Sequence, residues 1–328
     1  MIQHQKKIVQ MLKLKNFSKK FYNFLIKKVN NVLKKFNYLI IYRYGNAIGD
    51  HLYMTGVISK IYEKKFKIIV FSNYPELFLN NPKIYKLFDL NKFINKNILL
   101  SMLNFLQGES IKSFRNQIDD SEKYSFMKFY PRNIHIAHAA CFHFEMNLKF
   151  DNFKNEIFFS RDEILKFRKK LDLPNNFAVI HSEAKKTYTK SKNWGHERIQ
   201  NIINKFDKIN WIQVGRPGEY ELENIYKKYF NISLRELAYI IYSSDFLVCM
   251  EGMYNHMASA FEKKNFLIHI GFLTMDAFRY SNNVLIEKNL ELSCYPCFSF
   301  DCDNHKNHCD NYLTSDYAID IIRKNLNN

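Results

Sequence analysis

The chain has few acidic residues and no long apolar run. Of its 328 residues, 32 are aspartate or glutamate and 49 are lysine or arginine, which gives a formal net charge of +17. No stretch approaches the roughly 18 consecutive apolar residues that a membrane-spanning helix needs. The first residues also lack the apolar core and small-residue cleavage site of a secretory signal, so we expect a cytoplasmic protein.

Sequence patterns of the common nucleic-acid-binding modules are absent as well. The chain contains no RRM, KH or zinc-finger pattern, and its GNAIG segment is not the G-x-G-x-x-G of a dinucleotide site. The net charge alone would suit nucleic acid, an anionic membrane surface or a phosphate-bearing substrate. Lysine, asparagine, isoleucine and phenylalanine are all abundant, however, as an AT-rich coding sequence produces. We therefore expect no nucleic-acid partner.

Positive charge is concentrated in residues 1–36, which contain ten lysines and no acidic residue. Apolar side chains from Ile8 to Leu33 interleave with these lysines at roughly helical spacing. A basic amphipathic helix of this kind is typical of a segment that lies on an anionic membrane surface. The alternative is a helix packed on the domain that follows it, with its lysines in solvent. An RNA-binding arm fits less well, because the segment is not arginine-rich.

The stretch Tyr38–Tyr62 predicts a strand, a glycine-containing loop and a helix. An apolar run is followed by Gly45 and Gly49, and apolar residues then recur at helical spacing. Asp50 stands where the loop becomes the helix, and two roles fit it. It could be an N-cap or first-turn carboxylate that interacts with the helix dipole, or act as a general base in a cleft at the carboxyl ends of the strands.

Strands and helices alternate along the rest of the chain in two series. After the first unit we expect strands at Phe66–Ser72 and Lys86–Leu90, a helix starting in Tyr74–Leu79, and mostly helical sequence at 91–120. The alternation of strands and helices begins again after a boundary near Glu156–Leu173. The second series has expected strands at Phe177–His181, Asn210–Val214, Phe246–Cys249 and Phe266–Ile270 and expected helices at Glu197–Phe206, Ser233–Tyr242 and 313–326. This alternation predicts two doubly wound sheets with a ligand cleft between them.

Two groups of side chains could bind metal. His135 and His138 could share one face of a helix, with His143 nearby, although packing is the interpretation we favour. Four thiols lie within sixteen residues, at Cys294, Cys297, Cys302 and Cys309. They could close a tetrahedral, structural site for iron or zinc, or remain reduced and without a ligand in a surface loop.

Three motifs occur in the order and separation that one enzyme family has. They are R-x-G-x-x-x-G-D from Arg43 to Asp50, K-x-W from Lys192 to Trp194, and E-G-x-x-x-H from Glu251 to His256. Together they resemble glycosyltransferase family 9, the ADP-heptose:lipopolysaccharide heptosyltransferases, over about residues 38–310. Common members have T-N-D-T-G-P-x-H where this chain has the segment that ends at His256. That departure is similar to a branch that includes autotransporter-modifying heptosyltransferases.

The resemblance implies an α/β protein of the GT-B fold, in which two doubly wound Rossmann-like domains face each other across a cleft. We expect a basic amphipathic helix at 1–36, an acceptor-side domain at 37–158 and a nucleotide-sugar-binding domain at 159–328. The last of these would carry the Cys-rich loop 294–309, a place where some members of the branch hold iron. The final helix would cross back to the first domain.

On the acceptor side, the resemblance assigns Asp50 the role of general base. An inverting transferase needs one group to take the proton of the acceptor hydroxyl while that oxygen attacks the anomeric carbon. Gly45 and Gly49 would let the backbone approach the acceptor or the sugar closely.

On the donor side, Lys192 matches the lysine that binds phosphate in the family. Lys185 is a second candidate in the same loop. The helix after Gly252 would offer backbone N–H groups to the departing diphosphate, with His256 near phosphate or ribose. Two roles fit Glu251. It could accept a hydrogen bond from a ribose or sugar hydroxyl, or it could be a buried structural carboxylate.

These assignments predict an inverting glycosyltransferase on the inner face of the membrane. Its donor would be ADP-heptose or a similar nucleotide sugar, and its acceptor a surface glycan, a lipid-linked glycan or a protein. Catalysis would need no cofactor, since protein groups would neutralise the diphosphate and no D-x-D metal motif stands in a credible place. The alternative is a catalytically inactive GT-B-like binding protein that is tethered to the membrane surface.

Overall fold

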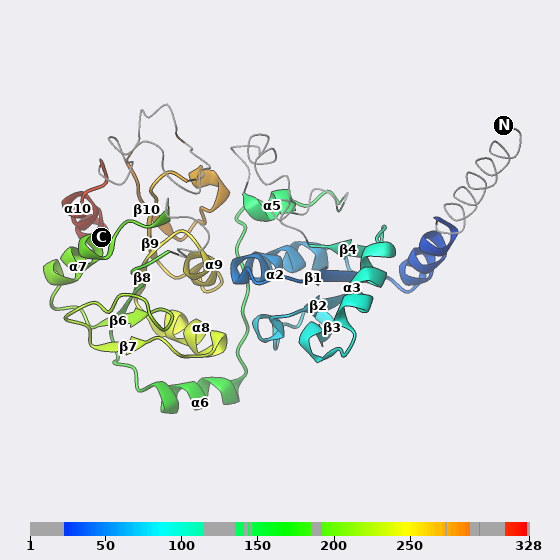
Figure 1. The fold of residues 1–328 in the computed structure, drawn as a ribbon, viewed down its shortest axis with the longest axis horizontal. Coiled ribbons are helices and arrows are strands. Elements are labelled where there is room, and N and C mark those ends of the chain that lie inside the picture. Colours follow the sequence, from blue (N-terminus) through cyan, green and yellow to red (C-terminus); the bar gives the residue numbers. More distant parts are fainter. Residues whose placement is uncertain are drawn as a thin grey trace, which may run out of the picture.

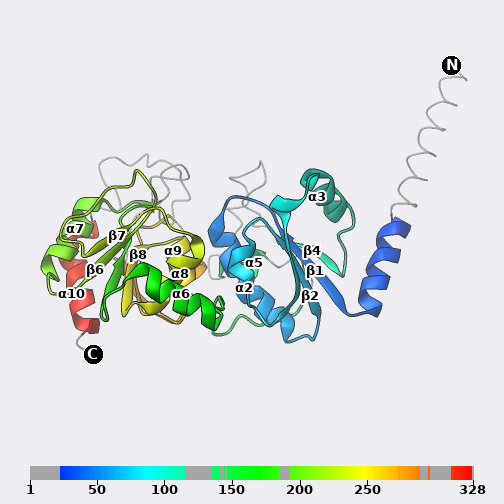
Figure 2. The same cartoon turned by 90° about the horizontal axis from the view of Figure 1, so that it is seen from below.

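The computed structural model describes residues 23–114, 135–140, 144, 146–184, 192–272, 274–288, 295 and 312–326. These residues form two lobes side by side, each with a parallel sheet between helices, and an extended linker joins them (Figures 1 and 2). A helical stretch at 23–35 lies at the outer edge of the first lobe. Among the residues described, no helix is long and apolar enough to cross a membrane.

The first lobe contains a four-stranded sheet in the order β3-β2-β1-β4, in which every pair is parallel. Its strands are β1 (Tyr38–Arg43), β2 (Lys67–Ser72), β3 (Ile84–Asp89) and β4 (Ile111–Ser113). Its helices are α2 (Ile48–Tyr62), the 3-10 helices η1 (Pro75–Phe78) and η2 (Leu90–Lys92), α3 (Lys96–Phe105) and α5 (Ile136–Ala140). Leu39 and Ile41 of β1 pack toward α2, and Tyr42 packs toward α3 on the other face, as the two-residue period of a strand requires.

The second lobe contains a six-stranded parallel sheet in the order β10-β9-β8-β5-β6-β7. Its strands are β5 (Ala178–Ile180), β6 (Trp211–Val214), β7 (Lys227–Tyr229), β8 (Phe246–Met250), β9 (Asn265–Ile268) and β10 (Asn283–Ile286). Its helices are α6 (Arg161–Leu171), α7 (His196–Lys205), α8 (Leu234–Ser243), α9 (Met253–Ser259) and α10 (Ser315–Leu326), with the 3-10 helix η6 (Met275–Ala277). The strand order reverses between β5 and β8, and in the first lobe between β1 and β4. Sheets of this type bind their ligands at such a reversal, beside the carboxyl ends of the strands.

The structure confirms the α/β class and both doubly wound sheets, and it corrects three expectations about single elements. β4 lies in sequence that we expected to be mostly helical, and Tyr74–Leu79 contains only the short helix η1. The final helix does not cross back to the first domain. α10 packs on α7 and β10, because Ala318, Ile319 and Ile322 are buried in the apolar cluster of the second lobe.

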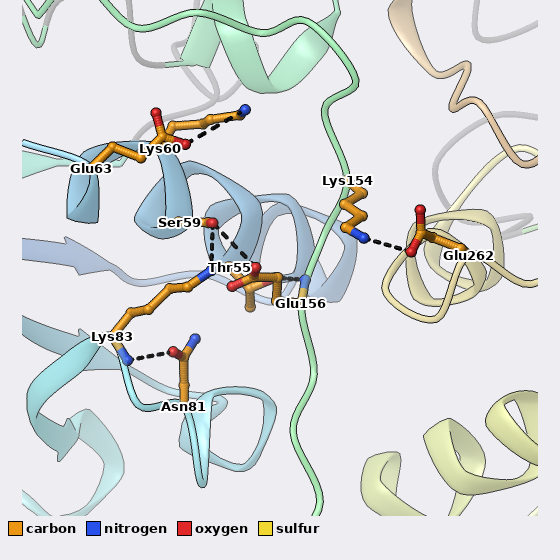
Figure 3. A network of polar contacts seen from close by, with 9 residues as sticks. All are labelled: Thr55, Ser59, Lys60, Glu63, Asn81, Lys83, Lys154, Glu156 and Glu262. Carbon is orange, nitrogen blue, oxygen red and sulfur yellow. Dashed lines mark hydrogen bonds and ion pairs between the residues drawn. The ribbon is translucent and has the colours of Figure 1, made fainter.

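The linker is held from both sides by polar contacts (Figure 3). On the first lobe, the Glu156 backbone N–H donates to Thr55 Oγ1 at 2.9 Å, and the Glu156 carboxylate pairs with the Lys83 ammonium. Lys83 Nζ also donates to Ser59 Oγ at 2.7 Å. On the second lobe, Lys154 Nζ lies 2.5 Å from Glu262 Oε2. The chain therefore crosses between the lobes along a defined path.

The two lobes also share buried apolar surface. α2 of the first lobe packs against α9 of the second, and one cluster of buried side chains contains residues of both, among them Leu52, Val57 and Met257. The carboxyl ends of β1 and β8 lie next to these two helices in the chain. The packing of α2 on α9 thus brings the loops that follow both strands toward the same junction.

Candidate active site at the junction of the lobes

Asp50 lies in the first turn of α2 and is held by two donors. Its Oδ2 is ion-paired with Arg43 Nη2 at the end of β1, and its Oδ1 accepts a hydrogen bond from Tyr53 Oη at 2.5 Å. All three side chains are buried. Both partners donate and one is positively charged, which favours the ionised carboxylate. That is the form able to accept a proton.

The loop before Asp50 is fixed by residues that the sequence motifs did not identify. Gly45 has φ +149, a conformation that favours glycine, and both its N–H and its carbonyl bond to the Asn73 side-chain amide, at 3.2 and 2.9 Å. His51 Nε2 lies 3.3 Å from the same carbonyl, and its Nδ1 lies 2.8 Å from Ser72 Oγ. Burial lowers the pKa of His51 to about 3, so the ring is neutral near pH 7. A neutral imidazole can donate to the Gly45 carbonyl and accept from Ser72.

Gly49 and Tyr53 bring the first lobe into contact with His256 of the second. A Cβ atom added to Gly49 would lie 3.1 Å from His256 Cδ2, a tight approach for any larger residue. The rings of Tyr53 and His256 meet edge to face, with centroids 5.6 Å apart. Tyr53 therefore touches the candidate base on one side and the candidate donor-side histidine on the other.

His256 is held in α9 by partners from other elements. Its Nδ1 lies 2.7 Å from Tyr280 Oη, and that oxygen accepts a hydrogen bond from Asn155 Nδ2 of the linker at 3.0 Å. Asn155 Nδ2 also donates to the His256 carbonyl at 2.8 Å. Burial, with smaller effects of His135 and Lys192, lowers the pKa of His256 to about 3. The imidazole is thus neutral near pH 7, and the linker contributes directly to its position.

Lys192 and Glu251 form a buried ion pair next to His256. Lys192 Nζ lies 2.8 Å from Glu251 Oε1, and the side chains are 14% and 4% exposed. The same ammonium lies over the rings of Phe272 and Phe278, at 4.8 and 4.9 Å from their centroids. In a site from which water is mostly excluded, the attraction between this cation and its aromatic and carboxylate partners is stronger than it would be in water.

The structure thus brings most of the predicted site residues together. Gly49 and Tyr53 from the first lobe approach His256 directly, and Tyr53 also bonds to Asp50. Lys192, which is paired with Glu251, lies close enough to lower the pKa of His256. Gly252, with φ +145, precedes the seven-residue helix α9. Five predicted residues lie outside the described part of the chain: Lys185, Cys294, Cys297, Cys302 and Cys309.

The histidines near α5 pack among aromatic rings, as we favoured. His138 stacks on Phe150 with centroids 4.3 Å apart, and His135 meets the Tyr280 ring at 4.9 Å. In the described ranges, no three His, Cys, Asp or Glu side chains gather in a way that could hold a metal ion. His143 lies outside those ranges.

A second polar group, which no sequence motif indicates, lies at the carboxyl ends of β5 and β6. His181 Nε2 is 3.4 Å from Glu219 Oε2, and the same carboxylate accepts from Arg216 Nε at 2.7 Å. The ring centroid of Tyr254 in α9 lies 3.9 Å from the ring centroid of His181. This group stands at the strand-order reversal of the second sheet, where doubly wound folds bind nucleotides.

Comparisons with known proteins identify the fold. No family model matches the sequence, and no curated protein matches it either. Among solved structures, the iron-containing dodecameric glycosyltransferase TibC from enterotoxigenic E. coli is similar at TM-score 0.64 and 13% identity, over 89% of this chain and 79% of that one. E. coli ADP-heptose lipopolysaccharide heptosyltransferase II is similar at TM-score 0.63 and 9% identity, over 87% and 98%.

A glycosyl transferase of family 9 from Veillonella parvula is similar at TM-score 0.58 and 12% identity, over 76% of this chain and 86% of that one. Identities of this size relate folds and leave activities open. The chain therefore has the two-lobed GT-B fold, with its candidate site residues at the junction of the lobes.

Proposed function

We propose that this GT-B protein is an inverting glycosyltransferase in which Asp50 is the general base. The observation that carries the proposal is the contact of Tyr53 with both Asp50 of the first lobe and His256 of the second, with the Lys192–Glu251 pair close to His256. A transferase of this kind needs an acceptor and a donor brought together between two lobes, with a base on one side and positive charge on the other. The fold similarity to glycosyltransferases supports the same proposal.

On the acceptor side, Arg43 and Tyr53 orient the Asp50 carboxylate. The acceptor hydroxyl would give its proton to this carboxylate as its oxygen attacks the anomeric carbon of the donor sugar. The bond from that carbon to the diphosphate breaks in the same step. Gly45, held by Asn73 and His51, would place loop backbone beside the acceptor or the sugar.

On the donor side, Lys192 would bind the diphosphate as negative charge builds on it. Glu251 holds the Lys192 ammonium in place and would accept a hydrogen bond from a sugar or ribose hydroxyl. His256 and the backbone that follows Gly252 would complete the donor site, with Lys185 in the same loop as Lys192. One of the similar structures is an E. coli ADP-heptose lipopolysaccharide heptosyltransferase, which supports ADP-heptose as the first donor to test.

We place the reaction at the cytoplasmic face of the membrane, with residues 1–36 on anionic lipid and a surface glycan, a lipid-linked glycan or a protein as acceptor. The four cysteines of loop 294–309 remain a prediction of a closed iron or zinc site, a role that the iron in TibC supports. Such a site would stabilise the loop, and the transfer step proposed here does not pass through it. Catalysis itself would use the chain's own groups.

The proposal is tested by measuring release of nucleoside diphosphate from ADP-heptose and related donors in the presence of a lipid and glycan extract. Asp50→Asn should lower this release by about 10²- to 10⁴-fold, the usual contribution of a general base. Tyr53→Phe is the matched control. It removes one donor to the same carboxylate and keeps the base, so we expect it to lose less than about tenfold. Both variants should bind ADP as the wild type does.

Two results would count against the proposal. Full turnover by Asp50→Asn would leave Asp50 with only its structural role in the first turn of α2. A wild-type protein that binds nucleotide and releases no diphosphate from any donor would favour the catalytically inactive binding protein.

A further inference from the structure

Helix α3 presents apolar side chains on two faces. Its inner face packs Leu99, Leu100 and Leu103 into the apolar cluster of the first lobe. Its outer face carries Ile98 and Met102, which are 60% and 55% exposed, followed by Phe105 one turn later. The spacing of these three is i, i+4, i+7, so they form one stripe along the helix. A surface helix of a globular protein normally has only one apolar stripe, which implies that something covers the outer one.

The outer stripe borders a groove beside the helical stretch 23–35. The groove has a volume of about 540 Å³ and is lined mainly by Leu25, Leu106 and the outer stripe of α3. Asn30 fixes the stretch to the lobe, because its Nδ2 donates to the Leu106 carbonyl at 3.1 Å and its Oδ1 accepts from the Ser110 N–H at 2.7 Å. The groove is therefore part of the folded lobe and already present before anything binds.

Exposed apolar residues extend the surface around the groove. Phe24, on the helical stretch, is 60% exposed, and Ile94, just before α3, is 99% exposed. Side chains of this size rarely gather on the exposed surface of a protein that has no partner there.

The charge around the groove has one sign. Residues 91–108 contain two lysines, Lys92 and Lys96, and no acidic residue. The stretch 23–36 contains four lysines and likewise no acidic residue. The nearby Glu109 is ion-paired with Lys34 at 2.6 Å, so its charge is already balanced. An apolar surface with a rim of lysines is complementary to a bilayer that contains anionic lipid.

We propose that the outer face of α3 and this groove bind an anionic lipid bilayer, in addition to any contact that residues 1–22 make. A second copy of the chain suits the surface poorly, because a two-fold contact would bring two lysine rims together. Residues 1–22 suit it poorly too, since they contain six lysines and no acidic residue.

The position of this surface fits the candidate site. Lys96 Nζ lies 5.6 Å from the centroid of the Tyr44 ring, and Tyr44 belongs to the loop between β1 and Asp50. Binding through α3 would therefore bring the acceptor side of the junction close to the lipid headgroups. The surface itself does not depend on transfer activity, because lipid binding is measured without turnover.

The test is co-sedimentation of the full-length chain with vesicles of phosphatidylcholine alone or with phosphatidylglycerol added. We expect binding to the anionic vesicles, weakened about tenfold by Ile98→Gln/Met102→Gln, since less apolar surface enters the interface. Leu165→Gln is the matched control, because Leu165 is equally exposed, at 55%, on α6 of the other lobe. Lys92→Gln/Lys96→Gln should weaken binding about fivefold for each lysine, on anionic vesicles only.

A fluorescent reporter gives a second reading that does not depend on loss of binding. The two tryptophans of the chain, Trp194 and Trp211, are both buried, so Met102→Trp adds an exposed one. Its emission should shift to the blue on anionic vesicles.

Three results would overturn the proposal. Ile98→Gln/Met102→Gln could bind vesicles as the wild type does, which would leave the membrane contact to the N-terminal residues. The reporter at position 102 could keep its emission on vesicles. The wild type could fail to bind vesicles and sediment as a dimer that the double variant dissociates, which would make this face a contact between copies.

Discussion

Several candidate residues at the junction have structural contacts that are compatible with the chemical roles proposed for them. Asp50 stands in the first turn of α2, where it can interact with the helix dipole, but the N-cap is Ala47, and Arg43 and Tyr53 hold the Asp50 oxygens. The two roles that the sequence left open are therefore compatible in one side chain. Glu251 is similar, because it is buried and also holds the candidate phosphate-binding lysine.

Three buried histidines predict how stability depends on pH. Burial lowers the pKa of His51, His135 and His256 to about 3, from an ordinary value of about 6.5. Between these values the unfolded chain binds protons that the folded chain does not. The free energy of unfolding should therefore fall as the pH drops below about 6.5, by about 1 kcal/mol per histidine between about pH 7 and about pH 5.5.

Urea-induced unfolding at the two pH values measures this effect. His256→Gln should reduce the fall by about 1 kcal/mol, because glutamine does not titrate in this range. An equal fall in the wild type and in His256→Gln would mean that His256 accepts its proton in the folded state.

The sequence predicted the candidate residues that belong to short motifs and missed those that tertiary packing supplies. Asp50, Lys192, Glu251 and His256 each lie in a motif, and the structure places them at the junction of the lobes. The partners of His256 were not predicted. Tyr280 lies 24 positions from His256, and Asn155 lies 101 positions away, so no local pattern indicates either contact.

At the scale of elements, the linker is held mainly by one of its two ion pairs. The Lys83–Glu156 pair is mostly buried, with side chains 23% and 15% exposed, whereas the Lys154–Glu262 pair is 44% and 62% exposed (Figure 3). Water screens the exposed pair and weakens its contribution. The partly buried pair should therefore fix the linker on the first lobe.

We expect Glu156→Gln to lower the free energy of unfolding by about 1–3 kcal/mol, because it leaves the Lys83 ammonium partly buried with a weaker partner. Lys154→Gln is the control from the same linker, and it should change stability by less than about 0.5 kcal/mol. Urea unfolding of both variants measures the difference. Equal effects of the two substitutions would contradict the assignment of the linker's stability to Glu156.

The length of a strand and its position in the sheet together explain which strands the sequence could predict. β1, β2 and β8 have five or six residues and appear as apolar runs that end in polar residues or glycine. β4 and β7 have three residues each and lie at edges of their sheets. β5 also has three residues, but it is central and fully buried and so appears as an apolar run, whereas an edge strand needs few apolar residues. Pairing with a neighbouring strand forms these elements, and that neighbour is distant in the sequence.

At the scale of the whole molecule, the candidate site forms where the two lobes meet, because the loops at the carboxyl ends of β1 and β8 both lie at that junction. In each lobe the strand order reverses next to the first strand, at β1 and at β5, and the shared apolar cluster packs α2 on α9. The sequence predicted both sheets and a cleft between them. It could not predict the contacts that hold the candidate residues there, such as those of Tyr280 and Asn155 with His256, since they depend on how the lobes pack.

The most direct test of the account is thermal unfolding of the full-length chain with ADP and with other nucleoside diphosphates. The account predicts that ADP at about 100 times its dissociation constant adds about 2.7 kcal/mol of apparent stability. Lys192→Gln should abolish this gain, and so should Lys192→Gln/Glu251→Gln, in which no unpaired buried charge remains. Lys208→Gln, on the surface of the same lobe, should keep it. If no nucleotide stabilises the wild type, or if ADP stabilises the Lys192 variants equally, the junction is not a nucleotide-sugar site.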